Sequence, residues 1–244
     1  MESERYLTAL ARESEALAAA AAAAGPSAPV PSCPGWTVAD LLVHCASGDL
    51  WARTIVEQRT TQRVSADLPE DPPTGDALVP WFLDGAHALV VALTEVDPTT
   101  SVWTFSPADR TAEFWRRRRA LETAVHRYDA QLAVGPSATT PIEAELAADG
   151  VDEYLTVYVP RWGKDVAGPG QSLHFHCTDV EGEWLVVGTD DGVTVTREHA
   201  KGDVAARGSA SDLMLFVWGR EPASRLEVFG DAALLDQFSG AINV

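Results

Sequence analysis

Three side chains of types that bind transition metals occupy informative positions in this sequence. Glu122 and His126 are four residues apart, so in a helix they lie on one face, one turn from each other. His44 lies in a separate segment that has its own helical pattern. Two imidazoles and one carboxylate form the ligand set of a catalytic metal site with one open position. If the three side chains converge, the sequence predicts a metalloenzyme.

Four long helices are expected in the first 135 residues to position these groups. The second begins near Thr37, a plausible N-cap with Asp40 three residues later. Its core-facing stripe includes His44, together with Leu41, Gly48, Trp51 and Ile55. The other three are expected at about Glu2–Ala24, Gly75–Val96 and from after Asp109 to about Val134.

The fourth predicted helix has an unusually polar inner stripe. It consists of Trp115, Arg119, Glu122, His126 and Asp129. Buried polar groups need partners, and a metal ion is one way of supplying them. The run Arg116–Arg119 points all round the helix, and we expect most of it to be solvated surface.

After residue 171 the pattern changes from helical to extended. Segments 172–177 and 193–198 alternate, 184–188 is a short apolar run, and Asp191-Gly192 is a turn signal. A fourth strand at 203–207, a helix from Ser209, a strand near 226–230 and a last helix complete a small α+β domain. We therefore expect an α+β protein with a helical domain at 1–140, a linking helix and loop at 141–170, and the small domain at 171–244.

Composition excludes several classes of function. The net charge is −18 and both halves are acidic, which argues against nucleic acid or an anionic membrane as a partner. The cysteines are Cys33, Cys45 and Cys177, a sparse, odd count that fits a reducing cytoplasm. We see no secretory signal or transmembrane span and expect a cytoplasmic protein.

Two motifs resemble those of a known family. Cys33-Pro34-Gly35-Trp36-Thr37, followed by Asp40-Leu41 and His44, is similar to the N-terminal signature of the mycothiol-dependent maleylpyruvate isomerase family. The segment FWRRRRALETAVHRYDA resembles its second signature, with Glu122, His126 and Asp129. This resemblance implies a DinB-like four-helix bundle and a C-terminal α+β domain similar to sterol-carrier proteins.

The resemblance also implies a chemistry. His44, Glu122 and His126 would hold a divalent metal, with zinc the first choice over iron, nickel or manganese. Asp129 would orient His126. The open position would take water or the thiolate of mycothiol, an actinobacterial thiol, and the bias towards Arg and Ala suggests a GC-rich genome. The thiolate would add to an electrophilic small molecule, making the protein an isomerase or a transferase.

Other residues have both a functional and a plain interpretation. Arg119 and Arg220 are candidate clamps for a dianionic substrate, or surface ion pairs. Trp36 and Trp51 are expected to pack the bundle or to line the mouth of the pocket. His174 and His176 share a strand face, where they could chelate metal or simply form its polar side.

Three functional hypotheses stay open at this point. The first is the mycothiol-dependent metalloenzyme. The second is a non-catalytic module that binds a thiol or small molecule through the same bundle. The third is a thiol-independent hydrolase that uses a metal-bound hydroxide. No sequence feature indicates an oligomeric interface.

Overall fold

We analysed a computed structural model of the chain, which describes residues 2–65, 72–163 and 165–240. The chain forms two compact units, residues 1–140 and 141–244. The second unit therefore includes the segment 141–170 together with the sheet that follows it. The predicted α+β class is confirmed.

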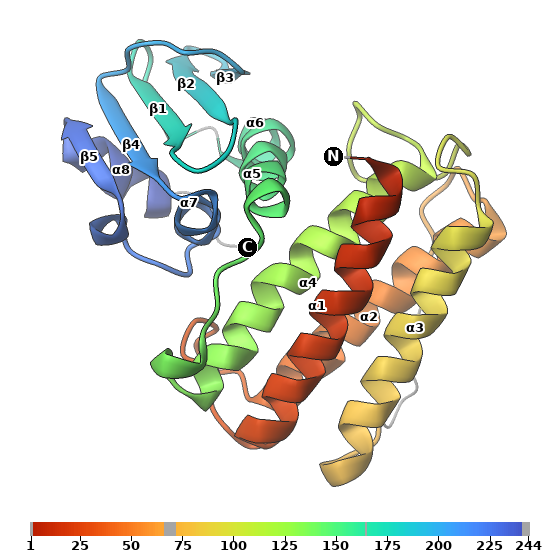
Figure 1. The fold of residues 1–244 in the computed structure, drawn as a ribbon. Helices are drawn as coiled ribbons and strands as arrows, with labels where there is room; N and C mark the ends of the chain where they lie inside the picture. The colour runs from red at the N-terminus through yellow and green to blue at the C-terminus, as the bar shows by residue number, and fades with distance from the viewer. Residues whose placement is uncertain (1, 66–71, 164, 241–244) are drawn as a thin grey trace. The chain divides into compact units, whose positions relative to one another are not determined.

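Within its described residues, the first unit is a bundle of four long helices (Figure 1). They are α1 (Ser3–Ala24), α2 (Val38–Gln58), α3 (Leu78–Glu95) and α4 (Ala112–Val134). The helix α1 packs mainly along α4, and α2 packs mainly along α3. Leu10, Leu17, Leu41, Ile55 and Phe82 are fully buried between the helices. The four helices predicted from hydrophobic periodicity are thus present, and only α2 and α4 carry the three candidate ligands.

The start of α2 is fixed by a capping box. Thr37 Oγ1 accepts a hydrogen bond from the backbone N–H of Asp40, and Asp40 Oδ2 accepts one from the backbone N–H of Thr37. These bonds satisfy two donors that a helix leaves without intrahelical partners at its N-terminus. The predicted cap is confirmed, and it fixes the start of α2 at Val38, just after Thr37.

The expectation that most of the arginine run is solvated is wrong. Arg116, Arg118 and Arg119 are only 2–5% exposed. Arg116 Nη2 donates to the carbonyls of Leu93 (2.6 Å) and Val96 (2.8 Å), at the end of α3. The last carbonyls of a helix lack intrahelical partners, so a guanidinium from α4 satisfies them. Arg118 and Arg119 pair instead with carboxylates, Arg118 with Glu122 and Arg119 with Glu122 and Asp49.

The segment Gly75–Glu95, which is α3 with the short helical turn before it, has a mean hydropathy of 1.5. Among the described residues it is the one helix long and apolar enough to cross a membrane by length and composition. In the structure it is one of the four packed helices of the bundle. A single helix of this kind is weak evidence for a membrane span, since a bundle core needs the same composition.

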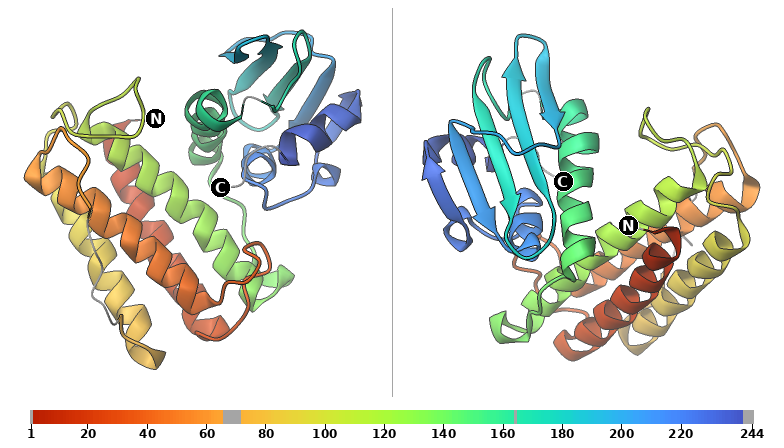
Figure 2. Two further views of the ribbon diagram at one scale, coloured as in Figure 1. Left: turned by 180° about the vertical axis from the view of Figure 1, so that it is seen from behind. Right: turned by 45° about the horizontal axis from the view of Figure 1, so that its top comes forward.

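The second unit begins with α5 (Ala144–Glu153), which continues through a π-helical turn (Tyr154–Tyr158) into α6 (Val159–Trp162). Its described strands are β1 (Ser172–Cys177), β2 (Glu183–Thr189), β3 (Gly192–Thr196), β4 (Val204–Gly208) and β5 (Glu227–Gly230). They form one sheet in the order β3-β2-β1-β4-β5, in which β1 and β4 are parallel and the other pairs antiparallel. The helices α7 (Ala210–Val217) and α8 (Ala232–Gly240) follow β4 and β5 (Figure 2).

The two faces of this sheet differ. Phe175 of β1 packs against Phe216 of α7 and Phe238 of α8, so the helices cover the face to which Phe175 points. His174 and His176 flank Phe175 and therefore point to the opposite face. Sequence alternation predicted this separation of apolar and polar residues.

Loss of the α2 cap should destabilise the first unit measurably. We expect Thr37→Ala to lower the free energy of unfolding by about 1 kcal/mol, because the N–H of Asp40 loses its acceptor. Thr37→Ser keeps a hydroxyl and should cost less than about 0.5 kcal/mol. Urea unfolding followed by circular dichroism measures both values. Equal effects of the two substitutions would show that the hydroxyl does not cap the helix.

Candidate metal centre

The three candidate ligands come together between α2 and α4. His44 Nε2 lies 3.3 Å from Glu122 Oε1, and His126 Nε2 lies 3.9 Å from the same oxygen. One ligand atom from each residue lies within 4.8 Å of the others. The exposed fraction of the side chain falls from 43% for His44 to 18% for Glu122 and 7% for His126. The cluster therefore runs from the surface of the bundle into its interior.

The exposure of His44 differs from the sequence prediction of a core-facing position. Its neighbours on the predicted stripe, Leu41 and Ile55, are fully buried. The His44 ring instead lies at the edge of the bundle, with its centroid 4.9 Å from the ring of Trp36 and 5.0 Å from that of His126. A ligand at the rim of the site leaves access from solvent, which a position in the core would not.

A buried carboxylate holds the innermost histidine. His126 Nδ1 lies 2.9 Å from Asp129 Oδ2, and Asp129 is fully buried. Ser32 Oγ donates to the other carboxylate oxygen at 2.6 Å. An N–H at Nδ1 satisfies Asp129 and leaves the lone pair of Nε2 directed towards Glu122. This is the arrangement of a histidine prepared to ligate through Nε2.

The two carboxylate oxygens of Glu122 face different partners. Oε2 forms ion pairs with Arg119 Nη1 and, at 3.2 Å, with Arg118 Nη2. Oε1 faces the two imidazoles. Burial opposes ionisation of Glu122, but the two guanidinium groups outweigh it and hold its pKa well below the usual range. Glu122 is therefore an anion at neutral pH with one oxygen left to face the histidines.

Arg119 connects this glutamate to a second buried carboxylate. Arg119 Nε lies 2.9 Å from Asp49 Oδ1, and Nη2 donates to the carbonyl of Cys45 at 3.3 Å. Burial raises the pKa of Asp49, and the charge of Arg119 opposes that rise. A Cβ added to Gly48 would lie 2.9 Å from Arg119 Cζ. Glycine at this position therefore makes room for the guanidinium beside α2.

The remaining predicted site residues lie in several places. Trp36 is beside His44, as expected for a residue at the mouth of the site. Trp51 packs against Trp103 and Trp115, and its Nε1 donates to the carbonyl of Val64. Arg220 is in the second unit, where Nη1 donates to the carbonyl of Trp218 at 2.6 Å.

Sequence reasoning missed Asp49, Arg118 and Ser32. Asp49 is five residues after His44 and is off the predicted core-facing stripe, so the spacing did not single it out. The available signal was the neighbouring Gly48, because a glycine within a helix can have a packing reason. Ser32 precedes the Cys33-Pro34-Gly35 motif, and nothing local indicates its bond to Asp129.

The four-helix bundle, with a histidine–carboxylate cluster on two of its helices, is of the DinB-like type, and a small α+β unit follows it. The family models narrow this class. The mycothiol maleylpyruvate isomerase N-terminal domain matches residues 7–131, and the C-terminal domain of the same family matches residues 145–237. The chain belongs to the mycothiol maleylpyruvate isomerase family, which is a family of enzymes.

Solved structures share this fold. The crystal structure of the mycothiol-dependent maleylpyruvate isomerase is 16% identical, with a TM-score of 0.63, and the match covers 93% of each chain. The crystal structure of a histidine-to-alanine variant of that enzyme is 15% identical, with a TM-score of 0.64 and the same coverage. No curated protein sequence matches the chain significantly. At these identities the likeness establishes the fold.

Two glycine substitutions should test the tight packing of Arg119. We expect Gly48→Ala to destabilise the protein by about 1–3 kcal/mol, because the new methyl group displaces a guanidinium that has acceptors on three sides. Gly85→Ala, in α3 with no atom within 4 Å of the added Cβ, should stabilise it by about 0.5–1 kcal/mol. Thermal and urea unfolding measure both. Equal stabilisation by the two substitutions would contradict the packing described here.

Proposed function

We propose that the protein is a mycothiol-dependent metalloenzyme in which His44, Glu122 and His126 hold a divalent metal, zinc being the best fit. The observation that carries this proposal is the convergence of two imidazoles on Glu122 Oε1 while the guanidiniums occupy Oε2. Family membership supports the use of mycothiol. The two solved structures of similar fold are of an enzyme described as mycothiol-dependent and of its variant.

The donor set suits zinc on chemical grounds. Nitrogen and oxygen ligands of intermediate softness favour zinc over magnesium or calcium, which prefer oxygen alone. The three ligand atoms lie within 4.8 Å of one another, so small side-chain rotations bring them around one ion. Asp129 supplies the outer carboxylate that ligating histidines usually have.

When bound, a divalent ion at three protein ligands provides an open position at which a thiol loses its proton near neutral pH. The residues of this chain have separate roles around that position. Asp129 fixes the ring of His126, and Arg118 and Arg119 keep Glu122 anionic. We assign Arg119 a positioning role, because its guanidinium is buried and bound to Asp49, Glu122 and the carbonyl of Cys45.

The reaction follows from thiol chemistry. The sulfur of mycothiol adds to one carbon of a conjugated double bond in the electrophile, and the electron pair of that bond moves into the adjacent carbonyl. Rotation about the resulting single bond and elimination of the thiol return the geometric isomer with no net change in atoms. If the new carbon–sulfur bond is kept and the carbon next to the carbonyl is protonated, the product is instead the thioether of a transferase. The maleylpyruvate isomerase relatives favour the first course.

Two further residues are candidates for binding the reactants. Trp36 lies against His44 and offers an apolar wall beside the exposed ligand. Arg220 remains our candidate in the second unit for a substrate carboxylate. Trp51 belongs to the aromatic cluster of the bundle, so we assign it to packing.

We expect the enzyme to work in a reducing cytoplasm. Cys33, Cys45 and Cys177 are all free thiols. Burial raises the pKa of Cys45 well above its usual range and that of Cys177 to about 12. Cys45 and Cys177 are therefore poor nucleophiles, and we expect the reacting sulfur to be that of the cosubstrate.

The test compares metal content and turnover in wild type, His44→Ala, His126→Ala and His87→Ala. His87 is an exposed histidine of α3 and serves as the control. After reconstitution with zinc, the two ligand variants should contain about one equivalent less metal than wild type and His87→Ala. Isomerisation of maleylpyruvate should require added mycothiol and should be lost in both ligand variants.

Equal metal content in all four proteins would overturn the metal assignment. Turnover of substrate without thiol would identify a hydrolase instead, and metal binding without turnover of any conjugated electrophile would identify a binding protein. Either result contradicts the proposed reaction. Chromatography of the products separates a geometric isomer from a thioether.

A further inference from the structure

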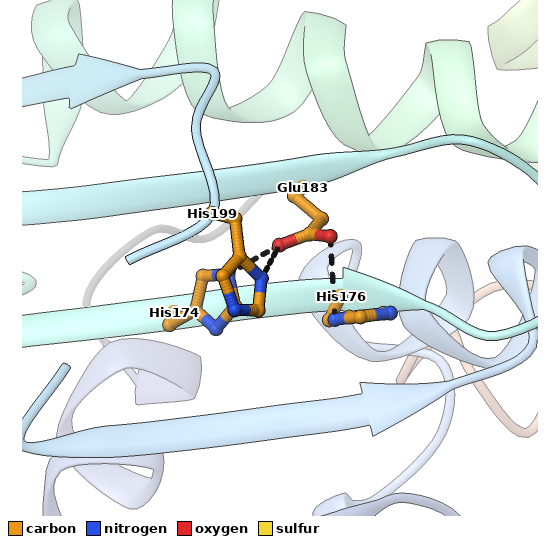
Figure 3. A group of neighbouring side chains, drawn as sticks. All are labelled: His174, His176, Glu183 and His199. Carbon is orange, nitrogen blue, oxygen red and sulfur yellow. Dashed lines mark hydrogen bonds and ion pairs between the residues drawn. The ribbon is translucent and has the colours of Figure 1, made fainter. Parts of the chain in front are cut away.

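A second group of histidines lies in the second unit, among residues that have no role in the reaction just proposed. It consists of His174 and His176 of β1, Glu183 of β2 and His199 of the connection between β3 and β4 (Figure 3). One ligand atom from each residue lies within 4.8 Å of the others. We propose that these four side chains form a second, structural zinc site.

The strand register brings three of the four groups to one face of the sheet. His176 and Glu183 are directly paired across β1 and β2, and His174 lies two residues along β1 on the same side. Glu183 Oε2 lies 3.2 Å from His174 Nε2, and Oε1 lies 3.6 Å from His176 Nδ1. The backbone itself therefore sets the positions of these three ligands.

The connection from β3 to β4 supplies the fourth group. His199 Nδ1 lies 2.5 Å from Glu183 Oε2. The end of this connection is anchored to β1, because Asp203 Oδ2 accepts from the N–H of Ser172 at 2.8 Å and Asp203 N donates to the carbonyl of Ser172 at 3.0 Å. His199 thus lies on a segment that is held to the sheet at both ends.

The spacing of the cluster is compatible with a tetrahedral site. Ligand atoms around zinc lie roughly 3.3–3.5 Å apart, given bonds of about 2.0–2.1 Å. Two of the Glu183–imidazole distances, 3.2 and 3.6 Å, are near that spacing, whereas His199 Nδ1 is 2.5 Å from Glu183 Oε2 and would have to move outward to become a ligand. The three rings are mutually edge-on, with interplanar angles of 81–88°, so they surround a common point instead of stacking.

The charge and burial of the cluster also suit a cation. Three imidazoles and a carboxylate offer four ligands, the number found in closed structural zinc sites. His174 is only 5% exposed, so the inner side of the cluster is shielded from water. Arg207 of β4 is the neighbour of His176 in the sheet, so its positive charge lies near the cluster. The guanidinium of Arg207 is 3.6 Å from the carboxylate of Glu227, which partly balances that charge.

A metal here would fasten the β3–β4 connection to the sheet. The side chain of His199 is 79% exposed, whereas that of His174 is 6% exposed. An ion bound to both would join the outer segment to the inner strand. We expect the ion to stabilise the second unit against unfolding. We expect it to take no part in the reaction at the first site.

The test is zinc binding to chelator-treated full-length protein, measured by equilibrium dialysis with elemental analysis. His199→Ala and His176→Ala should each weaken the second zinc by more than about 100-fold, since loss of even an outer partner of a ligand costs 10–100-fold. The first zinc should remain. His87→Ala is again the control and should bind as wild type does.

The same substitutions, made in protein that already carries His126→Ala, distinguish the second zinc site from the site proposed in the first unit. There the second site alone should bind about one zinc and raise the melting temperature, and His199→Ala should abolish both effects. His199 is exposed, so this variant should fold normally, which circular dichroism without metal checks. Unchanged zinc binding in His199→Ala and His176→Ala would overturn the second site and leave the proposed function untouched.

Discussion

The candidate metal centre depends on the buried guanidinium of Arg119. It lies between Asp49 of α2 and Glu122 of α4, and all three groups are largely removed from water. Charges in such an environment are tolerated only when they are paired, and loss of one partner from a buried pair typically costs about 3–5 kcal/mol. The ion pair therefore fixes both the separation of the two helices and the ionised state of Glu122. Without it, His44 and His126 would have no anion to converge on.

The surrounding charges favour a cation at this position. Two guanidinium groups, of Arg118 and Arg119, are set against three carboxylates: Glu122 in the cluster, Asp129 bound to His126, and Asp49 bound to Arg119. This excess of negative charge is buried, where electrostatic attraction is stronger than in water. A divalent ion together with a thiolate anion would balance it. In the proposed enzyme it is the ion, and not the surrounding carboxylates, that would stabilise the thiol as the anion.

Much of this structure could be predicted from the sequence, because the signals are local. The spacing of Glu122, His126 and Asp129 places them on one side of a helix, and Thr37 with Asp40 marks the start of α2. The alternating segments identified the strands to within a few residues. Each of these inferences uses neighbours close in the chain.

What could not be predicted are the contacts between elements distant in the chain. Arg116 was predicted to be a surface residue, but carbonyls at the end of α3 bind it, and the partner of Arg119 on α2, Asp49, was not predicted. Likewise, His199 joins His174 only because the β3–β4 connection crosses the sheet on that face. Such contacts depend on packing and register, which periodicity does not encode.

The most direct test of the central claim is anomalous diffraction at the zinc edge from crystals of the full-length protein grown with zinc. We predict a peak about 2.0–2.2 Å from Nε2 of His44, Nε2 of His126 and Oε1 of Glu122, with Oε2 still bound to Arg119. A structure in which zinc avoids these atoms and His44 stays hydrogen-bonded to Glu122 would contradict the account.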